Sequence, residues 1–197
     1  MSGLVFLGGT MSVNDAHDWL AEEIDLISLA ADEGLPMLGH CMGSQLLAKA
    51  LGGTVTPMPD KEIGWHEVRK LDNPIAQEWL RAMPDRVEIF IWHHEAFSLP
   101  PGAAPLYSST HCPVQAFAFG NTIATVAHPE VTTAMAEEWL SIYGYDIEPV
   151  SARVQPIDQI RERLAERCAT MHCLFTDRLY DAWLARVRTH NLGDVIA

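Results

Sequence analysis

Apolar and polar positions alternate in a regular order along the first fifty residues. Residues 3–9 (GLVFLGG) form a short apolar run that ends in glycines, which is typical of a buried strand followed by a turn. The next segment predicts a helix, because its apolar positions recur with a period near 3.6 residues: Trp19, Leu20, Ile24, Ile27 and Ala31. Gly34 ends this helix. Residues 35–39 then predict a second strand, and residues 44–51 predict a second helix.

The middle of the chain has a different pattern, in which proline and glycine separate short apolar stretches. These stretches predict strands at about residues 54–57, 64–70, 87–92, 104–109, 114–119 and 122–127. The pair Gly120-Asn121 lies between the last two and fits a tight hairpin turn. Three helical patterns follow, at about residues 132–143, 156–168 and 171–187.

This order of elements predicts an α/β fold. The early alternation of strands and helices favours a mostly parallel, doubly wound sheet with helices on both faces. The short middle strands predict small antiparallel additions to it. The chain has no internal repeat and no linker-like composition, so we expect a single domain over residues 1–197, with a core at about 3–145 and a helical C-terminal extension at about 150–197.

Composition narrows the classes of function. The 197 residues carry a formal net charge of −13 and a pI of about 4.9, so the chain lacks the excess of lysine and arginine that nucleic acids and anionic membranes require. No apolar run reaches the roughly 18–20 residues that cross a bilayer, and the first residues lack the basic start of a signal peptide. We therefore expect the four cysteines to be reduced thiols of a cytoplasmic protein.

Cys41 stands in the stretch LGHCMGSQLL, where an apolar strand meets an apolar helix. Gly39 and Gly43 flank it in the form of a nucleophile elbow, with cysteine where many hydrolases have serine. The following helix directs its N-terminal N–H groups toward the sulfur and favours the thiolate. The backbone N–H of Met42 faces the position where an oxyanion develops. We interpret Cys41 as a nucleophile, since an inert buried cysteine needs no glycine on each side.

A thiolate that attacks an amide needs a proton donor for the leaving nitrogen. Of the nine histidines, His128 follows an apolar strand in TIATVAHPE and so lies at a strand end, as Cys41 does. Pro129 keeps the preceding residue extended, and Glu130 projects to a similar side, where it can accept a hydrogen bond from His128. On spacing alone, the segment fits a surface loop with a Pro-Glu helix start equally well.

Other patterns are less informative. Gly8-Gly9 fits a backbone oxyanion donor, and it also fits an ordinary turn after a strand. His93 and His94 point in opposite directions in a strand and so cannot easily share a metal ion. The cluster of Cys168, His172 and Cys173 lies in a helical pattern without a second ligand pair, which favours core packing. No phosphate loop or dinucleotide fingerprint occurs, so we expect neither a metal nor a cofactor.

Taken together, these residues resemble the class I glutamine amidotransferase family. The stretch from Gly39 to Leu46, G-x-C-x-G-x-Q-L, is similar to the family's nucleophile motif. His128-Pro129-Glu130 is similar to its histidine–glutamate block, and Gly8-Gly9 to its oxyanion strand. Smaller similarities occur at Glu62-Ile63-Gly64-Trp65, at His93 with Leu99-Pro100-Pro101-Gly102, and at Gln115-Ala116-Phe117. The resemblance spans about residues 3–140.

The resemblance implies a flavodoxin-like fold and a catalytic triad. In that triad Cys41 is the nucleophile, His128 the general acid and base, and Glu130 the residue that orients His128. The backbone N–H groups of Gly9 and Met42 would form the oxyanion hole.

The same resemblance implies a substrate pocket and a reaction. Gln45 would help to hold glutamine, with His93 and Gln115 near the pocket. The side-chain amide of glutamine would be hydrolysed through a cysteine thioester to glutamate, and the ammonia would pass to a synthetase partner chain.

Two departures from the family pattern stand out. Family members carry a strand, a helix and a second strand before the strand predicted at residues 3–9, so we expect about 40–50 residues of that pattern to be absent here. A misassigned start, a fragment and a gap covered by a partner are all open explanations. Glu95 stands where relatives often have aspartate.

Two other functions stay open at the level of sequence. They are a γ-glutamyl peptide or amide hydrolase and a catalytically silent regulatory or binding module of the same fold. The oligomeric state, including a homo-oligomer, and the acceptor of ammonia are equally open.

Overall fold

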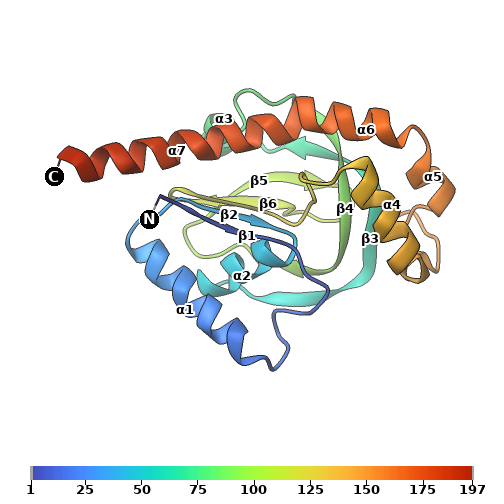
Figure 1. The fold of residues 1–197 in the computed structure, drawn as a ribbon, viewed down its shortest axis with the longest axis horizontal. Coiled ribbons are helices and arrows are strands. Elements are labelled where there is room, and N and C mark those ends of the chain that lie inside the picture. The colour runs from blue at the N-terminus through green and yellow to red at the C-terminus, as the bar shows by residue number, and fades with distance from the viewer. Residues whose placement is uncertain (1, 197) are drawn as a thin grey trace.

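A single seven-stranded sheet, in the order β1-β2-β7-β6-β5-β3-β4, runs through the computed structural model, which describes residues 2–196 (Figure 1). The strands are β1 (Leu4–Phe6), β2 (Met37–His40), β3 (Val55–Lys70), β4 (Arg86–Phe97), β5 (Ala104–Ser109), β6 (Ala116–Phe119) and β7 (Thr122–Thr125). The helices are α1 (Asp18–Asp32), α2 (Met42–Ala50), α3 (Pro74–Trp79), α4 (Thr133–Tyr143), α5 (Ile157–Arg161), α6 (Leu164–Met171) and α7 (Asp177–Ile196). They are joined by a 3₁₀ turn η1 (Gly144–Ile147) and a π-helical turn η2 (His172–Thr176).

The parallel part of the sheet consists of β1, β2 and β7, with β2 paired in parallel to both neighbours. The other pairings, from β7 through β6, β5 and β3 to β4, are antiparallel. The predicted α/β class is confirmed, but the sheet is mixed rather than mostly parallel. The reason is the short connections of the middle strands, because antiparallel neighbours can be joined by a two-residue hairpin such as Gly120-Asn121 between β6 and β7.

The longest departure from the predicted elements is the ribbon formed by β3 and β4. Prolines at 57 and 59 predict a break, yet β3 continues through them, and a register shift between Pro57 and Glu62 accommodates the irregular segment. β4 extends to Phe97, five residues beyond the predicted strand. This extension carries His93, His94 and Glu95 to the edge of the cleft described below.

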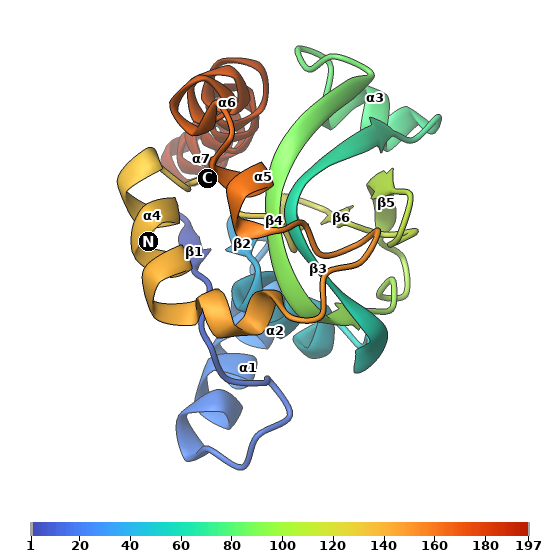
Figure 2. The same ribbon diagram turned by 90° about the vertical axis from the view of Figure 1, so that its right-hand side faces the viewer.

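Helices cover both faces of the sheet. Helices α1 and α2 enclose one apolar cluster with β1 and β2, while α4, α6 and α7 pack on the opposite face (Figure 2). Buried residues of the C-terminal helices, among them Met171, Phe175 and Leu179, belong to the same cluster as Phe90 of β4. The C-terminal segment is therefore part of the main core. None of the helices among residues 2–196 is long and apolar enough to span a bilayer.

The C-terminal helices are divided differently from the predicted pattern. Arg163, with φ of 53°, separates α5 from α6 within the helix predicted at residues 156–168. Farther on, the π-helical turn η2 interrupts the helical path between α6 and α7. Such turns are found often at functional sites. Helix α3 was not predicted, although its N-cap Asn73 and the proline at its first position are a regular helix start.

Helix α2 lies very close to β1 and β2 because glycine occupies both sides of the contact. A Cβ atom at Gly43 would lie 2.2 Å from the carbonyl oxygen of Phe6, and one at Gly39 would lie 2.5 Å from Leu47 Cδ1. Neither distance is possible for a real side chain. The paired glycines therefore set the separation between helix and sheet and, with it, the position of Cys41 between them.

We expect Gly43→Ala to lower the free energy of unfolding by at least about 2 kcal/mol, because the added methyl group collides with the backbone of β1. Urea unfolding followed by circular dichroism measures this change. Gly144→Ala is the matched control, since a Cβ atom there meets Ile157 Cδ1 at 3.4 Å, an ordinary contact. Equal stability of the two variants would contradict the packing argument.

Candidate active site

Cys41 lies at the corner between β2 and α2 in a strained backbone conformation. Its φ and ψ are 47° and −116°, a region that residues other than glycine rarely adopt and that costs about 1–3 kcal/mol. The N–H of Cys41 donates to the carbonyl oxygen of Thr125 at 2.8 Å, and this hydrogen bond holds the corner against β7. The sulfur lies 3.8 Å from the carbonyl oxygen of Trp92. Strain of this kind at a strand-to-helix turn is typical of an exposed nucleophile.

His128 faces Cys41 from the segment that follows β7. Its backbone N–H donates to the carbonyl oxygen of Phe90 at 2.9 Å, which anchors the segment to β4. A Cβ atom at Gly8 would lie 3.2 Å from His128 Cε1 and 3.4 Å from Cys41 Cβ, so both side chains meet at this glycine. Trp139 of α4 packs edge-on against the imidazole, with ring centroids 4.8 Å apart. The histidine is thus buried and held on several sides.

Glu130 orients the imidazole of His128. Its Oε1 lies 2.8 Å from His128 Nδ1, the distance of a strong hydrogen bond to a charged group. Nδ1 therefore carries a proton that it donates to Glu130, which leaves Nε2 as the nitrogen available to Cys41. The predicted contact is present, but Pro129 and Glu130 form a turn, closed by Val131 N–H to the carbonyl oxygen of His128 at 3.2 Å, rather than the extended path that the sequence pattern predicts.

Charge in the buried site is balanced between these three residues. Burial lowers the pKa of His128, but the charge and hydrogen bond of Cys41 and then the contact with Glu130 outweigh it and raise the pKa to about 10. Burial raises the pKa of Glu130, but contacts with His128 and then His40 hold it well below its usual range. An imidazolium between a sulfur and a carboxylate is an arrangement suited to acid–base chemistry.

Two glycines and the start of α2 line the cleft beside the sulfur. Gly8 and Gly9 follow β1, and a Cβ atom at Gly9 would collide with the side chains of Met42 and Met11 at 2.9 to 3.0 Å. The first N–H groups of α2, beginning with Met42, have no acceptor within the helix. Backbone N–H groups near a nucleophile can stabilise an oxyanion. Gly9 and Met42 are thus both at the cleft, and Gly8 is the glycine directly against Cys41 and His128.

The cleft in front of Cys41 has a volume of about 710 Å³. Gln45, a residue of α2, reaches its floor and donates from Nε2 to the carbonyl oxygen of Glu95 at 3.1 Å. Ser12 Oγ donates to the carboxylate of Glu95 and lies 2.9 Å from each of its oxygens. Aromatic side chains form the opposite wall: Trp92, Trp139, Tyr143 and Tyr145.

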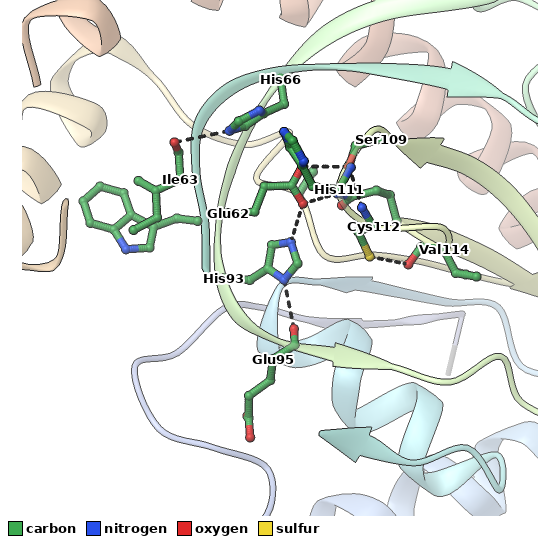
Figure 3. Close-up of polar contacts among 12 residues, drawn as sticks. Glu62, Ile63, His66, His93, Glu95, Ser109, His111, Cys112 and Val114 are labelled. Carbon is green, nitrogen blue, oxygen red and sulfur yellow. Dashed lines mark hydrogen bonds and ion pairs between the residues drawn. The ribbon is translucent and has the colours of Figure 1, made fainter. Parts of the chain in front are cut away.

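Behind this cleft lies a buried polar network centred on Glu62 (Figure 3). The Glu62 carboxylate contacts His93 Nε2 at 3.2 Å and accepts from Gln115 Nε2 and Ser109 Oγ, each at 2.7 Å. Burial raises the pKa of Glu62, but His93 and then Ser109 outweigh it and lower the pKa. The network fixes the ring of His93, whose Nδ1 lies 2.9 Å from the carbonyl oxygen of Glu95.

This network corrects the predicted role of Gln115. The side chain is fully buried and does not line the cleft, because its amide turns to Glu62 in the interior between the strands. His93 does lie at the wall of the cleft, although its ring nitrogens are directed at Glu95 and Glu62 rather than into the open space. Both residues support the wall from behind.

The predicted divergence of His93 and His94 holds in β4. His94 points the other way, with Nε2 2.5 Å from Asp146 Oδ2, and Asp146 also accepts from Trp92 Nε1 at 2.9 Å and Lys61 Nζ at 3.0 Å. These contacts hold the turn η1 over the rim of the cleft. Among the residues that the structure describes, no group of three His, Cys, Asp or Glu side chains is arranged to bind a metal ion.

Several residues of the site were missed at the level of sequence. Asp146 and the aromatic wall come from segments with no motif, and only the helical period of α4 places Trp139 on its inner face. His40, directly before Cys41, turns its ring to the back of Glu130, with Nδ1 3.1 Å from Oε2. The signal for His40 was its position in the glycine-framed stretch, where an imidazole is unusual beside an apolar strand.

A protein family and several curated proteins are similar to this chain in sequence. The sequence model of the family described as "Glutamine amidotransferase class-I" matches residues 1–141. A GMP synthase [glutamine-hydrolyzing] of Aeropyrum pernix is 35% identical over 150 residues, which cover 73% of this chain and 28% of that protein. The enzyme of the same description from Thermomicrobium roseum is 32% identical over 174 residues, covering 83% of this chain and 31% of that protein. The chain thus spans less than a third of the length of these curated relatives.

Solved structures are similar over most of the chain. The crystal structure of a glutamine amido transferase from Methylobacillus flagellatus has a TM-score of 0.89 and 38% identity, and the match covers 94% of this chain and 76% of that one. A glutamine amidotransferase from Thermotoga maritima has a TM-score of 0.76 and 27% identity, over 91% and 77% of the two chains. The match of the family model and these likenesses lead to one conclusion: the chain belongs to the class-I glutamine amidotransferase family.

Proposed function

We propose that this chain hydrolyses the side-chain amide of glutamine through a thioester on Cys41 and supplies the ammonia to a synthetase. The observation that carries the proposal is the relay from Cys41 through His128 to Glu130 at the floor of a cleft. A thiolate beside an imidazolium is the pair that amide hydrolysis by cysteine requires.

The first half of the reaction acylates Cys41. Its thiolate adds to the amide carbon of glutamine, and the resulting oxyanion is stabilised by the backbone N–H groups of Met42 and Gly9. His128 gives its Nε2 proton to the departing nitrogen, which leaves as ammonia, and the γ-glutamyl thioester forms. Gln45 lies on the floor of the cleft, where it can hold the amino-acid end of the substrate.

The second half releases glutamate. His128, now neutral, takes a proton from a water molecule that attacks the thioester, and the carbon–sulfur bond breaks to restore the Cys41 thiolate. Glu130 keeps the same hydrogen bond to Nδ1 through both halves and so holds the imidazole in one orientation. All of these steps use side chains and backbone of this chain, without a cofactor.

The chain alone does not account for the use of the ammonia. The curated relatives are named as GMP synthases, and more than two thirds of their length lies outside the match. We propose that a synthetase partner, carrying the activity of that unmatched part, accepts the ammonia. The cysteines of the described chain are free thiols, which supports a reducing compartment such as the cytoplasm.

A second function is favoured by the size of the cleft. Its volume of about 710 Å³ lies in the range of pockets that hold drug-sized ligands, about 300–1,000 Å³, and exceeds the needs of free glutamine. The wall formed by Trp92, Tyr143 and Tyr145 can bind an apolar leaving group. The same relay would then cleave a γ-glutamyl amide or peptide whose amine is larger than ammonia.

Glutamine hydrolysis is tested with the purified chain. We expect ammonia and glutamate in equal amounts, and we expect Cys41→Ala to reduce their formation by at least about 10⁴-fold, because the nucleophile is lost. A coupled glutamate dehydrogenase assay measures the ammonia. Mass spectrometry of Cys41 after treatment with a glutamine-like diazo-ketone detects the competent site even where turnover is slow. Ammonia release that survives Cys41→Ala would refute the proposed reaction.

The role of Glu130 is tested by the pH dependence of kcat/KM. The pKa of His128 is about 10, and the hydrogen bond and charge of Glu130 are among the causes that raise it. Glu130→Gln removes the charge, so we expect it to lower the pKa of His128. The alkaline limb, where the imidazolium loses its proton, therefore moves to lower pH in the variant. NMR titration of the His128 ring provides a direct measurement. An alkaline limb at the same pH in both proteins would argue against the contact as the source of the shift.

The second function predicts a preference for larger leaving groups. We expect a γ-glutamyl anilide to have a lower KM than glutamine, because its ring packs against the aromatic wall. Tyr145→Ala should raise the KM of the anilide more than that of glutamine, since Tyr145 lies at the open end of the cleft. Hydrolysis of glutamine alone, with no turnover of the anilide, would leave the amidotransferase reaction as the only function.

A further inference from the structure

His40 is a buried histidine whose ring is not used by the relay described above. It is the last residue of β2, and its side chain is 1% exposed. One edge of the ring faces Glu130, with Nδ1 3.1 Å from Oε2. One face stacks on the ring of Tyr180 from α7, with centroids 5.7 Å apart and planes inclined by 16°. The ring is therefore confined between the carboxylate and the C-terminal helix.

The carboxylate of Glu130 is shared between two imidazoles. Oε1 contacts His128 Nδ1 at 2.8 Å, and Oε2 contacts His40 Nδ1 at 3.1 Å. The second contact has the distance of a hydrogen bond, but its angle is unfavourable, so Oε2 and both ring nitrogens of His40 lack an aligned protein partner. Buried polar groups are rarely left in this state. A small rotation of the His40 ring would let its Nδ1–H donate a hydrogen bond to Oε2, which would satisfy both groups.

We propose that His40 is a positioning residue: by holding the second oxygen of Glu130, it keeps the first oxygen on His128 and the His128 imidazole directed at Cys41. This inference rests on the proposed function and extends it by one residue beyond the triad. Without His40, the carboxylate can rotate about its terminal bond, because Oε2 has no other hydrogen-bond donor among the described residues. The imidazole of His128 would then lose its fixed orientation.

The C-terminal segment supports this arrangement from behind. Thr176 Oγ1 donates to the carbonyl oxygen of Pro129 at 2.7 Å, and His172 Nε2 lies 2.9 Å from the carbonyl oxygen of Val131. Both residues belong to the π-helical turn η2, so this turn binds the chain on each side of Glu130. Tyr180, one turn later, backs His40. These contacts come from residues beyond 141, where the match to the family model ends.

The effect of His40 on the pKa of Glu130 agrees with a role in positioning that carboxylate. His40 is among the groups that lower the pKa of Glu130, after His128 and against the effect of burial. Glu130 in turn raises the pKa of Tyr180, where burial is the larger cause, to about 12. Among the described residues, the titratable groups in contact with the His40 ring are thus Glu130 and Tyr180. His128 binds the other oxygen of Glu130, and Cys41 follows His40 in the chain.

Two variants separate the ring nitrogen from the ring itself. His40→Phe keeps an aromatic ring against Tyr180 and removes the donor, whereas His40→Asn keeps an N–H near the position of Nδ1. With glutamine, we expect His40→Phe to lower kcat by about 10- to 100-fold with little change in KM, as loss of a supporting contact typically does. The alkaline limb of its pH profile moves to lower pH. His40→Asn should recover most of kcat and return the limb toward the wild-type pH.

A second readout does not depend on glutamine. The rate at which iodoacetamide alkylates Cys41, followed by peptide mass spectrometry as a function of pH, reports the pairing of the sulfur with His128. We expect His40→Phe to change this pH dependence and His40→Asn to restore it. The two readouts can disagree. If the wild-type protein does not hydrolyse glutamine but the alkylation profiles change as expected, the proposed function is refuted and the role of His40 remains supported.

The matched control is His66→Phe, which replaces another buried strand histidine, one that contacts the carbonyl oxygen of Ile63 instead of the triad. Thermal unfolding of each variant measures the fraction of folded protein, and the kinetic constants are corrected for it. Wild-type kcat and pH profiles in His40→Phe would overturn the proposal. So would a His40→Asn variant as impaired as His40→Phe, or an equal loss in His66→Phe, because a general effect of core histidines would then explain the result.

Discussion

The position of Cys41 depends on the close contact between α2 and the strands β1 and β2. Gly39 and Gly43 permit this contact because they carry no side chain at the points where helix and sheet backbones meet. The backbone at Cys41 is strained as a consequence, and the packing of the surrounding core keeps it so. The sulfur is thus placed by the interior of the protein rather than by a surface loop. Such placement fixes the sulfur relative to the imidazole of His128, and fixed geometry of this kind is what catalysis by proximity requires.

The same interior sets the charges of the site. Burial opposes the charged form of both His128 and Glu130, and each remains charged only because an oppositely charged neighbour lies within hydrogen-bond distance. Behind the cleft, the buried carboxylate of Glu62 is held by polar neighbours: it accepts from Ser109 Oγ and Gln115 Nε2 and lies 3.2 Å from His93 Nε2. These two centres lie on either side of the cleft wall formed by the end of β4. The cleft therefore has polar groups along the end of β4, while most of its aromatic side chains come from α4 and η1.

The sequence was sufficient for those parts of the molecule that depend on neighbours along the chain. The early strands and helices, the hairpin at Gly120-Asn121 and the elbow at Cys41 all follow from spacing over a few residues. The contact of His128 with Glu130 is compatible with their spacing, but spacing alone fits a surface loop equally well. The turn at Pro129 and the anchor of His128 to Phe90 bring the two side chains together. The pairing of His40 with Glu130, the continuation of β3 through its prolines and the burial of Gln115 depend on residues that are distant in sequence. Such contacts have no local pattern, and similarity to a family indicated only a general position for Gln115.

The contacts made by the π-helical turn join the segment of His128 and Glu130 to a distant part of the chain. His172 and Thr176 bind Val131 and Pro129 although 41 and 47 residues separate the partners in sequence. Tyr180, one turn farther along α7, stacks on His40. The outer support of this segment is therefore tertiary, and its order depends on how the C-terminal helices pack against the sheet.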